Sequence, residues 1–204
     1  MTIHNWTPKH TKTTMLSASI ILLIGFSRYL PLDFPFLYNF SPAIAVFWFC
    51  GGYFKGHFSW IAPVLAILVS DLLLNPSHGN HLWEPFMIAT LLSYSLIWFV
   101  GKKLGRGTNF KLWILGAIAS AILFHVVTCS FAWLINPAYS KTLHGLIQAI
   151  IIGESGYAPS YLFLRNSILS TFFFSIALRW TYIWAFSLSP KEESLTPSSS
   201  SVHT

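Results

Sequence analysis

Several charged and amide side chains of this chain stand in or beside long apolar runs. Arg28 closes the first run, Asn39 follows it in a segment rich in proline and aromatic residues, and Asp71 and Arg165 belong to later runs. A charge in such a run is costly and usually faces the interior of a helix bundle. A guanidinium suits carboxylate and phosphate groups through paired hydrogen bonds. We therefore expect these residues to contact a small polar or anionic solute.

The stretch from Ser27 to Ala45, SRYLPLDFPFLYNFSPAIA, predicts where such a solute binds. Ser41-Pro42 is typical of a helix start, because serine caps free N–H groups and proline suits the first helical position. The positive end of that helix, Arg28 and Asn39 would converge on one pocket at the outer face. Two other roles stay open for Arg28: it could cap the carbonyl end of the first run, or pair with Asp71.

Aromatic residues near the same face would supply the stacking walls of the pocket. Trp83 precedes the fourth apolar run, and Tyr157 precedes the last one. The predicted substrate-binding residues are therefore Arg28, Asn39, Asp71, Trp83, Tyr157 and Arg165.

Histidines offer a different chemistry. His125, Thr128 and Cys129 share one helical face in the fifth run, so His125 is either a functional group within the membrane or a hydrogen-bonded structural residue. His78, His81 and Glu84 in HGNHLWE have a spacing that allows a metal ion, but no HExxH or CxxC motif accompanies them. We expect no metal, no cofactor and no enzymatic activity; a membrane enzyme that uses either histidine group is the alternative.

The elements that must position these residues are membrane-spanning helices. Of the 204 residues, 54% are hydrophobic and only 9% are charged, against about 25% charged residues in soluble domains. The apolar runs predict an all-α bundle of about six transmembrane helices, near residues 14–30, 42–54, 59–74, 84–101, 112–135 and 160–186. We divide the chain into a cytoplasmic segment 1–13, one transmembrane domain 14–187 and a disordered cytoplasmic tail 188–204.

The lysines and arginines predict the orientation. With both termini inside, the inner face holds Lys9, Lys12, Lys55, Lys102, Lys103, Arg106, Lys111, Arg179 and Lys191. The outer face then holds only Arg28, Lys141 and Arg165. Cytoplasmic loops carry an excess of positive charge, so both termini are predicted to be cytoplasmic.

Several short motifs indicate a family resemblance: RYLP, NFSPAIAVF, GGYF and Ser70-Asp71, followed by TCSFAWL and RNSILS. They resemble an uncharacterised bacterial family of integral membrane proteins, which is similar in plan to the substrate-binding S components of energy-coupling-factor transporters. This chain departs from the resemblance at Ser170-Thr171, where an acidic residue is expected, and in lacking an AxxxA face on its first run.

The resemblance implies six helices, cytoplasmic termini, an outer binding pocket and separate energising subunits. The expected function is therefore that of a solute-binding or transport component in the bacterial inner membrane. Its partners would be the lipid bilayer, an unknown small solute, and possible energising membrane subunits and ATPases, with no nucleic acid. A structural or assembly protein without a ligand is a further alternative.

Overall fold

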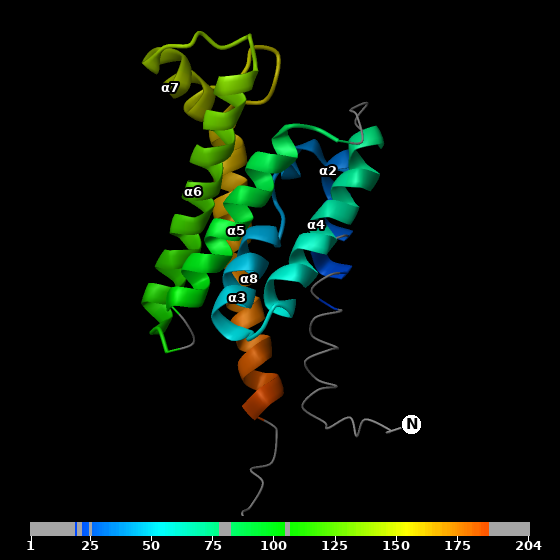
Figure 1. Cartoon of the computed structure of the whole chain (residues 1–204), viewed down its shortest axis with the longest axis vertical. Coiled ribbons are helices and arrows are strands. Elements are labelled where there is room, and N and C mark those ends of the chain that lie inside the picture. Colours follow the sequence, from blue (N-terminus) through cyan, green and yellow to red (C-terminus); the bar gives the residue numbers. More distant parts are fainter. Residues whose placement is uncertain (1–18, 20–21, 25, 78–82, 105–106, 188–204) are drawn as a thin grey trace, which may run out of the picture.

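The computed structural model describes residue 19 and residues 22–24, 26–77, 83–104 and 107–187, and every regular element in that part of the chain is a helix (Figure 1). The elements are α2 Leu30–Asp33, the 3-10 turn η1 Pro35–Leu37, α3 Ala43–Tyr53, α4 Phe58–Ser77, α5 Phe86–Leu104, α6 Phe110–Ile135, α7 Leu143–Ile151 and α8 Ser160–Ser187. The predicted all-α fold is confirmed for these residues.

Length and apolar character together divide the helical stretches into two groups. Three stretches are long and apolar enough to cross a membrane: Phe86–Leu104, Phe110–Ile135 and Ser160–Ala185. Two apolar stretches are shorter, Ala43–Tyr53 and Ser59–Leu73. These five fall on the second to sixth predicted spans. Residues 14–18, 20–21 and 25 of the predicted first span and all of segments 1–13 and 188–204 lie outside the described residues.

Helix α3 lies at the centre of the bundle. Its sequence is apolar on all sides, and ten of its eleven residues are buried, as expected for a helix that is surrounded by others. It contacts α4, α5, α6 and α8. At about 1.5 Å per residue the helix is only about 16 Å long, so the irregular segment before it must continue into the bundle.

Glycines allow the close packing of α3 against α5 and α6. A Cβ atom added to Gly51 would lie 2.1 Å from the Trp98 carbonyl oxygen, and one added to Gly101 would lie 2.5 Å from that of Trp48. The Trp48 indole, which is fully buried, occupies the space beside Gly116, where an added Cβ would meet it at 2.5 Å. A larger residue at these positions would force the helices apart.

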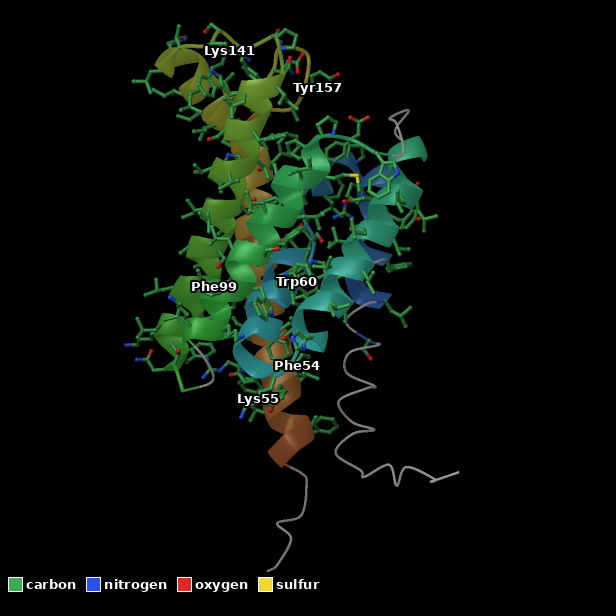
Figure 2. The ribbon with its side chains drawn as sticks, viewed as in Figure 1. Phe54, Lys55, Trp60, Phe99, Lys141 and Tyr157 are labelled. Carbon is green, nitrogen blue, oxygen red and sulfur yellow. The ribbon has the colours of Figure 1, made fainter. Side chains whose placement is uncertain are left out.

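Different segments of the chain lie at the two ends of the bundle. Figure 1 shows α2 and α7 toward one end and the α3–α4 connection at the other. Lys141 and Tyr157 lie at the α7 end, whereas Phe54 and Lys55 lie near the opposite end (Figure 2). We call these the α7 end and the Lys55 end. The candidate site lies toward the α7 end, beside α2 and the start of α3.

Candidate functional site

The segment between α2 and α3 forms one wall of the site. Asn39 has a left-handed backbone with φ of 62°, which asparagine tolerates better than most residues. Its carbonyl accepts the Ser41 N–H at 3.0 Å, and the Ser41 hydroxyl accepts the Ala43 N–H at 3.3 Å. The predicted start of the second span is therefore right to within one residue, with Pro42 as the N-cap of α3.

A residue far along the chain holds this segment in place. Asn166 on α8 is buried, and its side-chain amide donates hydrogen bonds to the carbonyls of Phe36 at 2.8 Å and Tyr38 at 2.9 Å. Arg165 donates from Nε and Nη2 to the Asn166 side-chain oxygen, at 3.2 and 3.1 Å. Because the amide oxygen of Asn166 accepts these bonds, its NH₂ group faces the two carbonyls.

A cavity of about 250 Å³ lies between this segment, the residues around Arg28, and α3, α5, α6 and α8. Its polar lining residues are Ser27, Arg28, Asn39, Ser41, Thr90, Thr128 and Ser167. Its aromatic lining residues are Tyr38, Phe40, Phe86, Tyr94 and Phe124. The mixture of aromatic walls with a few polar groups is typical of small-molecule sites.

Arg28 supplies the charge of the cavity and is also part of the scaffold. Its Nη2 donates to Asp71 Oδ1 on α4, and the two side chains form an ion pair. The Asp71 side chain is 8% exposed and that of Arg28 is 22% exposed. The Nε atom of Arg28 is buried and has no hydrogen-bond partner in the described part of the chain. The pairing with Asp71 is thus confirmed, and it does not prevent Arg28 from lining the cavity.

Three of the hydroxyl groups that line the cavity can accept a hydrogen bond from a solute more readily than they can donate one. Ser27 donates to the Ile24 carbonyl at 2.9 Å, Thr90 to that of Phe86 at 3.0 Å, and Thr128 to that of Phe124 at 2.8 Å. Each hydroxyl proton is therefore directed at the helix backbone, and the oxygen lone pairs remain available. A solute in this cavity would meet donors from Arg28 and Asn39 and acceptors from these hydroxyls.

The six predicted site residues are placed differently. Arg28 and Asn39 line the cavity, and Asp71 holds Arg28. Arg165 is exposed and donates hydrogen bonds to Asn166, which in turn supports the segment before α3. Trp83 is 68% exposed and Tyr157 is 73% exposed, and neither lines the cavity. As ligand contacts, all six remain predictions.

Tyr38, Tyr94, Thr90, Thr128, Ser167 and Asn166 belong to the site or its support and were not among the predicted binding residues. Two of them had a usable signal in the sequence: Thr128 shares a polar helix face with His125, and Asn166 follows Arg165 in the motif RNSILS. The other four contribute to the site only through the packing of separate helices.

His125 does not line this cavity. His125 is buried, and its Nε2 lies 2.8 Å from the Ile150 carbonyl oxygen at the end of α7. His78 and His81 lie outside the described residues. Within the described part of the chain, no group of three His, Cys, Asp or Glu side chains is placed to hold a metal ion.

Comparisons with known proteins place the chain in a family without assigning it an activity. No curated protein and no solved structure matches the sequence. A model described as "Family of unknown function (DUF6580)" matches residues 8–192. Because the match covers nearly the whole chain, the protein belongs to the family of unknown function DUF6580.

Proposed function

We propose that this protein is an integral membrane protein of about six spans that captures a small polar or anionic solute at the α7 end of the bundle. The observation that carries the proposal is the cavity beside Arg28. The cavity combines a charged donor, an amide, several hydroxyl acceptors and aromatic walls within a bundle of apolar helices. It is smaller than the about 300–1,000 Å³ of sites for drug-sized ligands, which favours a small solute.

The distribution of cations supports an orientation with the α7 end outside. Lys55, Lys102, Lys103, Lys111 and Arg179 belong to segments at the Lys55 end, and Arg179 donates to the Thr108 carbonyl at 3.2 Å near the start of α6. The α7 end has fewer cations among the described residues. By the positive-inside rule the Lys55 end faces the cytoplasm. The solute would then enter from the outer side of a bacterial inner membrane.

The electrostatics of the cavity restrict the class of solute. The Asp71 carboxylate neutralises Arg28, so the pair presents hydrogen-bond donors without a large net charge. A neutral polar, zwitterionic or weakly anionic molecule with a flat apolar part suits these groups and the aromatic walls. A strongly charged anion would have to compete with Asp71 for the guanidinium.

The role of substrate-binding component in transport rests on the resemblance to S components rather than on the cavity. The chain has no P-loop motif GxxxxGK[ST]. By that resemblance, uptake would use an energising membrane subunit and ATPases as partners. The enzymatic alternative is less favoured, because the Nε2 of His125 is already engaged by a backbone carbonyl.

Mass spectrometry of the natively purified protein tests solute binding directly. We expect a small molecule to copurify with the unaltered chain and to be lost when Ser167→Leu fills part of the cavity. Thr181→Leu is the matched control, because Thr181 lies on the same helix but is exposed and far from the cavity lining. The proposal would be contradicted if the folded protein, supplied with cell extract, held no small molecule. It would also be contradicted if both variants lost the bound molecule equally.

A further inference from the structure

A second and larger cavity, of about 810 Å³, opens at the Lys55 end. It lies between the α3–α4 connection, the first turn of α4 and the last turns of α5. Phe54, Lys55, Trp60 and Phe99 line it, and Figure 2 shows all four in the half of the bundle that contains this end. We call this cavity the basic groove.

Among the described residues, no carboxylate is placed to balance the lysines of the basic groove. Lys55, His57 and Lys102 line it, and all three are exposed. The carboxylate residues of the described chain are Asp33, Asp71, Glu84 and Glu154. They belong to segments toward the α7 end, and Asp71 is paired with Arg28. This contrasts with the cavity at Arg28 and makes the groove complementary to an anion.

The polar walls of the groove are already hydrogen-bonded within the protein. Trp60 Nε1 donates to Ser95 Oγ at 3.2 Å, and Trp98 Nε1 donates to Ser59 Oγ at 3.3 Å. The Ser59 hydroxyl itself donates to the Gly56 carbonyl at 2.8 Å. These bonds fix two indoles across the groove, and Lys102 Nζ lies 5.0 Å from the centre of the Trp98 ring. The ammonium groups are the strong donors that a ligand can use.

An apolar surface continues from the basic groove along α4 and α5. Ile61 is 39% exposed and Leu65, one turn further on the same face of α4, is 54% exposed. Phe99 is 47% exposed and Leu96, on the same face of α5, is 42% exposed. Tryptophan rings with lysines beside an apolar surface are typical of the boundary between lipid headgroups and acyl chains.

We propose that the basic groove binds an anionic phospholipid. Lys55 and Lys102 bind the phosphate of its headgroup, and an acyl chain runs between the exposed apolar faces of α4 and α5. A soluble phosphate compound would use the cations alone, whereas the adjoining apolar surface favours a lipid. The site lies at the opposite end from the cavity beside Arg28, so it stands independently of the proposed solute.

The experiment measures binding of phosphatidylglycerol to the purified full chain in detergent, by native mass spectrometry and by the shift in thermal unfolding. Phosphatidylcholine and soluble glycerol 3-phosphate are the comparison ligands. We expect phosphatidylglycerol to bind and to stabilise the protein, with little effect of the other two. The double variant Lys55→Gln/Lys102→Gln should bind phosphatidylglycerol about tenfold more weakly or worse, because each lysine contributes to anionic-lipid attraction.

A matched variant separates this site from general charge attraction. Lys103→Gln/Lys111→Gln removes the same charge from the same end, but neither lysine lines the basic groove. It should retain tight binding, as should Lys55→Arg/Lys102→Arg, which keeps the charge. Equal weakening in both glutamine variants would overturn the proposal, as would tight binding of phosphatidylcholine. Stronger binding of glycerol 3-phosphate than of the lipid would identify a site for soluble phosphates and would also overturn it.

Discussion

The two cavities use cations in opposite ways. In the first cavity, the guanidinium of Arg28 is part-buried and paired with the buried carboxylate of Asp71 on α4, so its position is fixed by a partner. At the Lys55 end, the lysines are exposed and belong to segments without a carboxylate. The same sign of charge therefore has a structural role in one region and remains available in the other. We therefore expect substitution of Arg28 to lower the stability of the protein, and substitution of the lysines to weaken ligand binding with little effect on stability.

The largest effect is expected from breaking the buried pair. Arg28→Gln leaves Asp71 as an uncompensated charge and should destabilise the protein by about 3–5 kcal/mol. Thermal unfolding in detergent measures this loss. The double variant Arg28→Gln/Asp71→Asn should recover most of the stability, because no buried charge is then left alone. If the double variant is no more stable than the single one, the pair does not fix this region.

The next largest effect is expected at Gly51, which lines the basic groove where α3 packs against α5. Gly51→Ala places a Cβ atom 2.1 Å from the Trp98 carbonyl oxygen, so α3 and α5 must separate. Overpacking of this kind costs about 1–3 kcal/mol or more. Gly107→Ala is the control, because nothing lies within 4 Å of an added Cβ there. Equal unfolding temperatures for the two variants would show that the helices do not approach so closely.

A smaller effect is expected at the support of the cavity wall. Asn166→Ala removes two part-buried hydrogen bonds to the segment before α3, and a typical hydrogen bond of this kind contributes about 0.5–1.5 kcal/mol. The same change should weaken binding of any copurified solute, because Tyr38 and Asn39 lose their support. Arg165→Ala should have a lesser effect of the same kind. Native mass spectrometry and thermal unfolding of the two variants give the comparison.

The smallest effect on stability is expected from the exposed lysines. Lys55→Gln/Lys102→Gln should change the free energy of unfolding by less than about 0.5 kcal/mol in lipid-free detergent, as is usual for surface substitutions. Any binding of anionic ligands at this end should weaken with salt, because exposed charges are screened. The destabilisation caused by Arg28→Gln should be much less sensitive to salt. A salt titration of unfolding for both variants tests the contrast.

The positions of the helices could be predicted from the sequence because apolar runs and helix starts are local signals. Ser41-Pro42 predicted the start of α3, and the runs predicted α4, α5, α6 and α8 to within a few residues. Orientation and transport remain predictions, since the helices alone do not test them. Trp83 and Tyr157 were proposed as walls from their nearness in sequence to the outer face, but the loops that carry them leave both exposed.

Composition and apolar runs were enough to predict an apolar, all-α fold with few charges, and to place Arg28 and Asn39 in an irregular segment between two apolar runs. The packing of the helices was needed to find that Arg28 both pairs with Asp71 and lines a cavity, and that Asn166, distant in sequence, hydrogen-bonds to the segment 36–38. The physical reason is that composition and helix periodicity act over neighbouring residues. Ion pairs, hydrogen bonds and cavities depend on which helix faces meet, and here that is set by the close packing of α3 against α5 and α6.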